Sequence, residues 1–196
     1  MTQTETTTAP ALSDRLKHAT RSTHEVLDSS IMQLEPFRDV ANYTTFLRIQ
    51  HALHADVAPL YERADLQALI PGLAEFCRLP AVTQDGADLG ANLPAQPQSA
   101  LPQGTDLPEA LGWLYVVEGS NLGAAFLIKA AHKMGLSETH GARHLAEAPE
   151  GRAAHWRRFK DGLNAAELTP AQQDRVIAGA NAAFARVQGL VDGCRA

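Results

Sequence analysis

Apolar residues recur along this 196-residue chain at intervals of three and four, the spacing of helices that bury one face. A first helix is predicted to open at Pro10 and to run to about Ser29. A second helix runs from about Val40 to Arg63, where Pro59 predicts a kink or the final turns. The apolar stripes of these two helices are predicted to consist of Leu12, Leu16, Ala19, Thr23, Val26, Leu27, Tyr43, Phe46, Leu47, Leu53, Val57 and Leu60.

The rest of the chain predicts further helices joined by proline-rich segments. The longest helix covers Leu107–Met134, and the last covers Thr169–Val191, where Thr169 and Gln172 form a capping box around Pro170. The remaining predictions are short helical pieces over 65–89, a loop over 90–108, a helical or turn segment over 140–145 and a helix within 149–165. No strand pattern of useful length occurs. The sequence therefore predicts one all-α domain of about seven or eight helices over residues 10–196, preceded by a polar tail, residues 1–9, that we expect to be disordered.

Composition and charge bear on the partners of the protein and on its location in the cell. The formal net charge is −5, which gives no indication of nucleic acid or an anionic membrane as a partner. The N-terminal segment has no basic start and no apolar core, so it predicts no signal peptide, and no uninterrupted apolar run reaches the length of a membrane span. Cys77 and Cys194 lie far apart without metal-site spacing, which fits a reducing compartment. We therefore expect a cytoplasmic protein.

The most unusual stretch lies inside the longest helix. Residues 116–131 read VVEGSNLGAAFLIKAA, with Gly119 and Gly123 on either side of Ser120 and Asn121. Each internal glycine costs a helix roughly 1 kcal/mol relative to alanine, and serine and asparagine are weak helix formers. The usual reason for such a choice is that something approaches the backbone more closely than a Cβ would allow. Another helix and a flat ligand both remain possible.

One of the eight histidines has an informative setting. Lys17, Thr20, His24 and Asp28 follow one another at helical spacing, so they share one stripe of the first helix. The Asp28 carboxylate could orient the His24 imidazole, as is usual behind a histidine that binds a metal. Lys17 lies about 10 Å further up the same face. The alternative is a solvent-exposed stripe with an ordinary i,i+4 pair.

Other polar groups leave more than one interpretation open. Gln50 and His54 lie one turn apart among apolar residues, so they either pair with each other and water or line a wet cavity. His140 and His144 have a spacing that could bind zinc, but the favoured interpretation is structural. The sequence contains no Ser-His-Asp arrangement, no phosphate-binding glycine loop and no pair of Glu-x-x-His motifs typical of di-iron bundles.

Taken together, these segments resemble the haem oxygenases, in particular the bacterial type that serves iron acquisition in Gram-negative pathogens. The resemblance covers nearly the whole chain. Its motifs are LK-AT---H near the start, EPF, FLR-Q---H (46–54), AVTQD (81–85), GWLYVVEGSNLGAAFL (112–127), HGARHLA (140–146) and HWRRF (155–159). It implies a helical bundle in which haem lies between the first, proximal helix and a glycine-kinked distal helix, with His24 as the axial iron ligand.

The resemblance also implies roles for individual residues. Gly119 and Gly123 would let the backbone approach the porphyrin, with Ser120 and Asn121 beside this steric wall, while Gln50 and His54 would hold distal waters. Many mammalian-type relatives carry Asp at the position of Ser120. Lys17 and Tyr115 match positions that contact the haem propionates, and Phe184 and Trp156 would pack the pocket. Relatives that cleave another meso carbon carry a lysine where this chain has Met32, so retention of Lys17 implies cleavage at the α-meso carbon.

The activity that the resemblance implies is cleavage of haem by O₂ to biliverdin, expected as the IX-alpha isomer, CO and ferrous iron. Electrons would come from an external donor of the ferredoxin or flavodoxin reductase type, because no flavin- or nicotinamide-binding motif occurs. The family implies a monomer. Two alternatives stay open: a haem-binding carrier or sensor on the same fold, and a helical enzyme of similar fold that binds no haem.

Overall fold

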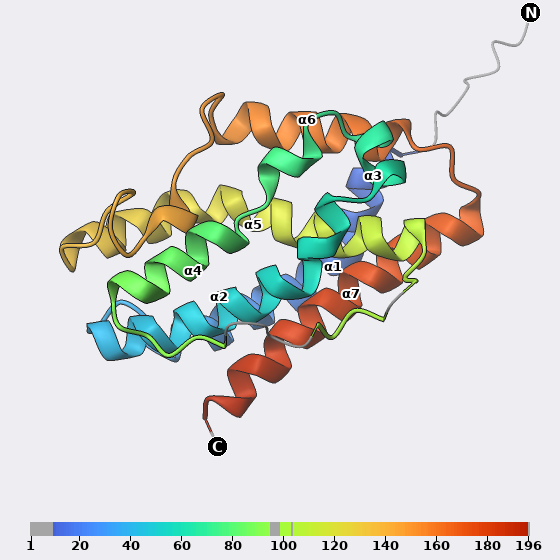
Figure 1. Cartoon of the computed structure of the whole chain (residues 1–196). Helices are drawn as coiled ribbons and strands as arrows, with labels where there is room; N and C mark the ends of the chain where they lie inside the picture. Colours follow the sequence, from blue (N-terminus) through green and yellow to red (C-terminus); the bar gives the residue numbers. More distant parts are fainter. Residues whose placement is uncertain (1–9, 95–98, 103, 196) are drawn as a thin grey trace, which may run out of the picture.

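The computed structural model describes residues 10–94, 99–102 and 104–195, and these form an all-α bundle (Figure 1). Its elements in chain order are α1 (Leu12–Met32), α2 (Val40–Tyr61), α3 (Ala64–Leu69), the 3₁₀ turn η1 (Leu73–Phe76), α4 (Leu79–Asp88), α5 (Leu107–Lys133), the 3₁₀ turn η2 (Arg143–Leu145), α6 (Arg152–Ala165) and α7 (Pro170–Gly193). The only β-type pairings in the described residues are two isolated bridges, from Ser137 to His140 and from Ser137 to Gly141. The all-α prediction is confirmed.

The predicted helix ends agree with the structure to within a few residues. Helix α1 continues to Met32, three residues past the predicted end, and Pro59 lies in the last turns of α2 without ending the helix. The Thr169–Gln172 capping box is present at the start of α7. Helix α5 stays continuous across both of its central glycines, so the predicted kink breaks no helical turn. The tail predicted to be disordered, residues 1–9, lies outside the described residues.

Three long helices, α1, α5 and α7, run in the same direction, while α2 and α6 run the opposite way (Figure 1). Helix α7 packs against both α1 and α5. Arg15 near the start of α1 pairs with Asp174 near the start of α7, with 2.9 Å between nitrogen and oxygen. At the other end, an Arg195 guanidinium nitrogen donates to the Ser30 carbonyl oxygen at 2.6 Å. These contacts fix α1 and α7 in parallel register.

The predicted stripe of α2 is confirmed, because all six of its residues are buried in the core. The stripe predicted for α1 is partly wrong. Val26 is 60% exposed and lines a groove of about 330 Å³ between α1 and α7, and Ala19 is also exposed. The buried face of α1 follows Leu16, Thr20 and Leu27 instead, so α1 turns Val26 outward.

Helix α5 is the one described helix that is long and apolar enough to cross a bilayer, which the sequence analysis did not anticipate. More than half of its most apolar segment is buried inside the protein. It packs against α7, α6 and α2. The apolar composition of α5 is therefore that of a helix in the core of the bundle.

Gly112 on α5 marks the closest approach between two helices. A Cβ at Gly112 would lie 2.1 Å from the Val176 carbonyl oxygen and 2.5 Å from the Ala180 nitrogen on α7. Across the same contact, a Cβ at Gly179 would lie 2.4 Å from the Glu109 carbonyl oxygen. Backbone atoms cannot move aside as a flexible side chain can, so α5 and α7 require glycine at these points.

We expect Gly112→Ala to destabilise the protein by about 3 kcal/mol, at the upper end of the usual cost of overpacking. For a chain of this size this lowers Tm by roughly 6–12 °C. Thermal unfolding measures the effect. Gly189→Ala on α7 is the control, because no described atom from outside its own stretch of helix lies within 4 Å of its added Cβ, and it should raise stability slightly. Equal Tm values for the two variants would contradict the packing argument.

Candidate functional site

Helix α5 exposes an apolar face beyond Gly112, although it is a core helix. Gly119, Leu122, Gly123 and Phe126 are spaced by three and four residues and therefore share this surface, called here the open face. Leu122 is 40% exposed and Phe126 is 76% exposed. A core helix with an uncovered apolar stripe is the usual sign of a binding surface.

Helix packing does not require glycine at either position of the open face. No described atom outside the helix lies within 4 Å of a Cβ built on Gly123. At Gly119 the nearest such atom belongs to the Trp156 ring, at an ordinary contact distance of 3.5 Å. Gly112 shows what a required helix contact looks like on the same helix. Helix packing in the described structure therefore does not require glycine at either position, and space for a ligand stays as the other explanation.

Helix α1 contacts α5 at Tyr115, one turn before Gly119. Thr20 on α1 is buried, its hydroxyl donates to the Leu16 carbonyl oxygen at 2.8 Å, and it lies beside the Tyr115 hydroxyl of α5. Burial raises the pKa of Tyr115, and the Thr20 hydroxyl lowers it in part. Helices α1 and α5 run in the same direction (Figure 1), and His24 and Gly119 each lie one further turn along their helix from the contact between Thr20 and Tyr115.

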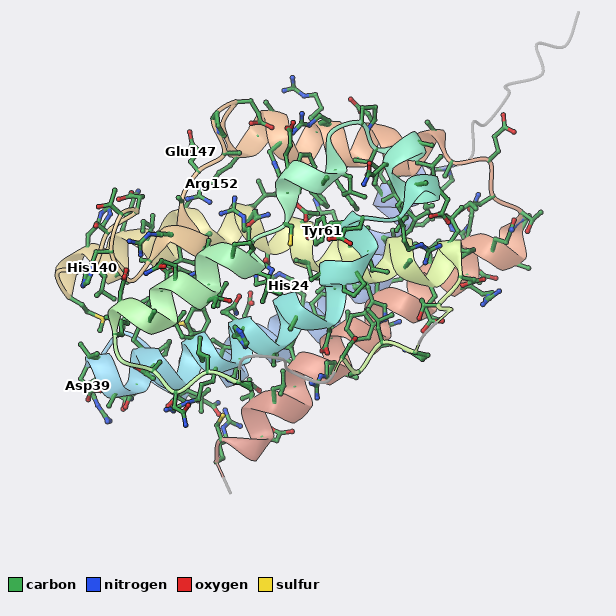
Figure 2. The ribbon with its side chains drawn as sticks, in the orientation of Figure 1. His24, Asp39, Tyr61, His140, Glu147 and Arg152 are labelled. Carbon is green, nitrogen blue, oxygen red and sulfur yellow. The ribbon has the colours of Figure 1, made fainter. Side chains whose placement is uncertain are left out.

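His24 interrupts the buried stripe of α1. Thr20 and Leu27 on either side of it are buried, yet the His24 side chain is 56% exposed. Its Nδ1 lies 3.1 Å from an Asp28 carboxylate oxygen, and its ring meets the edge of Phe184 with 5.9 Å between centroids. Figure 2 places His24 near the middle of the bundle. The carboxylate occupies Nδ1, so Nε2 on the other side of the ring is the nitrogen available to a ligand.

Lys17 and Tyr115 lie at the same end of the two helices. Lys17 on α1 is exposed and forms no ion pair with any described residue. It lies two turns before His24, and Tyr115 lies one turn before Gly119 on the facing helix. A flat ligand between α1 and α5 would therefore meet an ammonium and a hydroxyl at one edge, an imidazole on one face and a glycine backbone on the other.

A buried carboxylate on the back of α5 was missed in the sequence. Glu118 is fully buried; the Tyr61 hydroxyl donates to one of its oxygens, and His155 Nε2 and the Asn121 amide lie 2.7 and 3.3 Å from the other. Burial raises the pKa of Tyr61 well above its usual value, and the Glu118 charge adds to this. His155 also lines a separate cavity of about 530 Å³. These contacts place the Asn121 side chain behind the open face, whereas Ser120 is exposed and donates to the Val117 carbonyl oxygen at 2.7 Å.

The structure brings Gln50 and His54 into the interior of the bundle but forms no hydrogen bond between them in the described part of the chain. His54 is 3% exposed, and its Nδ1 has no described partner. Burial, together with His144 and Arg78, lowers the pKa of His54 to about 3. Gln50 is half-buried. Gln50 and His54 therefore do not pair directly with each other in the described structure, and water is the usual partner of a buried nitrogen that no protein group contacts.

His140 and His144 do not form a metal site. His144 is buried, and its Nδ1 lies 2.8 Å from a carboxylate oxygen of Asp85, which is fully buried. His140 is exposed and lies 3.4 Å from Asp88, and Figure 2 shows it well away from His24. Within the described residues, no group of three potential metal ligands converges. The structural interpretation of these two histidines is therefore supported.

The buried His54 predicts an acid-sensitive fold. The unfolded chain protonates this residue below about pH 6.5, whereas the folded protein keeps it neutral down to about pH 3. Between these values the unfolded state binds more protons, so stability is complete above pH 6.5 and falls as the pH falls. One such group contributes a slope of about 1.4 kcal/mol per pH unit. We expect the free energy of unfolding, measured with urea between pH 8 and 5, to show this decrease.

His54→Gln should remove part of this slope, because the substituted side chain does not titrate. His18→Gln is the matched control, since His18 is exposed on α1. Identical slopes for wild type and His54→Gln would show that His54 is not the neutral buried group.

Comparison with known proteins finds similarity to one protein family over nearly the whole chain. Residues 10–192 match the family model described as Heme oxygenase. Heme oxygenase PigA of Pseudomonas aeruginosa is 41% identical over 188 residues, which cover 96% of this chain and 95% of that protein. The structure is similar to crystal structures of NO- and CO-bound heme oxygenase from Neisseria meningitidis, with a TM-score of 0.87, 43% identity, and coverage of 93% of this chain and 91% of that chain. Heme oxygenase from Leptospira interrogans, at 18% identity and a TM-score of 0.76 over 93% of this chain and 98% of that one, shows the shared fold alone.

Proposed function

The chain belongs to the haem oxygenase family, and we propose that it cleaves haem, with O₂ and external electrons, to biliverdin, CO and ferrous iron. Haem is the substrate, and when bound it supplies both the iron that activates oxygen and the ring that is opened. The observations that carry this proposal are the exposed His24 imidazole on α1 and the two glycines of α5, since Gly123 meets no described atom outside its helix and Gly119 meets only the Trp156 ring at 3.5 Å. These two surfaces fit the two faces of a planar ring.

His24 is proposed as the axial ligand of the haem iron. Its neutral Nε2 would bind the metal, while the Asp28 carboxylate 3.1 Å from Nδ1 would hold the tautomer and the ring orientation. The edge of Phe184 restricts the ring from the side of α7. This chain thus supplies one oriented imidazole and leaves the opposite side to the backbone of α5.

Lys17 and Tyr115 are proposed to hold the haem propionates. The exposed ammonium of Lys17 can pair with a carboxylate, and the Tyr115 hydroxyl can donate to one. Both lie at the same end of the site, which would seat the ring in one rotation. With Met32 in place of a second lysine, this seating favours cleavage at the α-meso carbon and biliverdin IX-alpha as product.

The opposite face is proposed to combine a steric wall with ordered water. Gly119 and Gly123 let the backbone of α5 approach the ring, and Ser120 lies beside them with its hydroxyl bound to the backbone. The Asn121 side chain would support this wall from the buried side of α5, where its amide contacts Glu118. Water delivered near the ring would be held by Gln50 and by the unpartnered Nδ1 of His54. These groups would supply protons while the wall leaves room only for a small gas molecule.

The proposed partners follow from what the chain contains. The sequence has no flavin- or nicotinamide-binding motif, so a reductase of the ferredoxin or flavodoxin type would supply electrons. We propose that the enzyme acts as a monomer in the cytoplasm, where the biliverdin-forming reaction releases iron from haem.

An absorption titration with hemin, followed by reductant in air, tests the proposal. We expect a Soret band that saturates at one haem per chain and then disappears as biliverdin forms. A saturating band that survives reduction would instead identify a carrier or sensor on the same fold. Absence of any Soret shift would overturn the assignments of His24 and the open face together.

A further inference from the structure

Phe126 is the most exposed large apolar side chain in the described part of the protein, at 76%. An aromatic ring gains much from burial, so one left in water on a core helix calls for a ligand. We propose that Phe126 is a specificity-determining residue that contacts the apolar edge of bound haem, opposite the propionates, and fixes the rotation of the ring. This inference rests on the proposed function.

The position of Phe126 on α5 supports this contact. Seven residues separate it from Gly119, so it points within about 20° of the same direction and lies about 10 Å further along the helix. Tyr115 lies one turn on the other side of Gly119. A porphyrin about 10 Å across and centred over the two glycines would therefore have Tyr115 at one edge and Phe126 at the other.

The chemistry of the two ends matches the two edges of haem. The propionate edge carries two carboxylates, and the opposite edge carries only vinyl and methyl groups. Lys17 and Tyr115 offer polar partners at one end, whereas Leu122 and Phe126 offer an apolar surface at the other. If the ring rotated so that a propionate met Phe126, this propionate would lose its contact with the Lys17 ammonium. Its negative charge would then lie against an aromatic side chain, which is unfavourable.

Phe126 also separates the ring from a competing cation. Lys129 follows it by one turn, is exposed, and forms no ion pair with any described residue. With the phenyl group in place, the edge of the ring would meet an apolar side chain before it could reach this lysine. Removing the group would open a path for a propionate to reach the Lys129 ammonium, and thus a second seating of the ring.

The test uses Phe126→Ala, the conservative Phe126→Leu, and Val40→Ala as a control at an exposed apolar residue on α2. Haem dissociation is measured by transfer from the loaded protein to excess apomyoglobin. Ring seating is measured from the haem methyl signals in the NMR spectrum of the cyanide-bound ferric complex. Biliverdin isomers are then separated by chromatography, with Phe126→Ala/Lys129→Met as the companion variant.

We expect Phe126→Ala to lose haem about tenfold faster, the effect of one lost aromatic contact, and to show a second set of methyl signals and a second biliverdin isomer. Phe126→Leu and Val40→Ala should stay close to wild type, and the companion variant should lose the second isomer. Wild-type dissociation and a single seating in Phe126→Ala would overturn the inference while leaving the proposed function intact. Failure of the wild type to bind haem would overturn both.

Discussion

Replacing His24 by alanine is expected to abolish normal axial ligation of haem and to reduce biliverdin formation by at least two orders of magnitude, as is usual when a group that positions the reacting centre is lost. The structure provides no second imidazole in its place, because the buried histidines of the described residues all lie on elements other than α1; they are His51, His54, His144 and His155. The absorption spectrum of the hemin complex and single-turnover biliverdin yield measure the two effects.

The same substitution should leave the fold intact. The His24 side chain is 56% exposed, and its Asp28 partner is 63% exposed, so the pair contributes little to stability. Added imidazole should restore part of the spectrum and part of the turnover, since alanine leaves room for it. His18→Ala on the same helix is the control. An unchanged haem spectrum and full activity in His24→Ala would show that the ligand has been assigned to the wrong residue.

The sequence predicted those features of the site that depend on local spacing. Four residues separate His24 from Asp28, and one helical turn suffices to bring them together, as the structure shows. The contrast between Gly119 and its apolar neighbours likewise lies within a single helix. The capping box of α7 is another pattern that spans only three residues. In each case the helix itself supplies the geometry, so the residue spacing is enough.

Features that depend on how helices meet could not be predicted in the same way. Glu118 is held by Tyr61 and His155, which are 57 and 37 residues away in the chain. Gly112, which α7 requires, resembles any other tolerated glycine in an apolar stretch until α7 is placed against it. Val26 has the spacing of a core residue, but its helix turns it toward solvent. These properties belong to tertiary packing rather than to the period of one segment.

The contrast between Gly112 and Gly123 separates a structural role for glycine from a functional one. Both lie on α5, and a helix gains roughly 0.5–1 kcal/mol when an internal glycine becomes alanine. At Gly112 this gain is overwhelmed by contact with the α7 backbone. At Gly123 no described atom opposes a new side chain, so nothing in the ligand-free protein accounts for glycine there. Our proposal that glycine leaves space for the ligand there, at the cost of stability, supplies a reason.

Gly123→Ala should therefore raise the Tm of the ligand-free protein while lowering its activity, and Gly123→Leu should retain haem binding but lower biliverdin yield on the order of 100-fold. The reason is that a side chain at Gly123 projects from the open face into the space proposed for the ring and the gas molecule, displacing both from their productive positions. Thermal unfolding, hemin titration and biliverdin yield are measured on the same preparations, with Gly189→Leu as the control for an exposed helical glycine. An unchanged biliverdin yield in Gly123→Leu would remove the steric argument, because the open face would then have no influence on the reaction that it is proposed to direct.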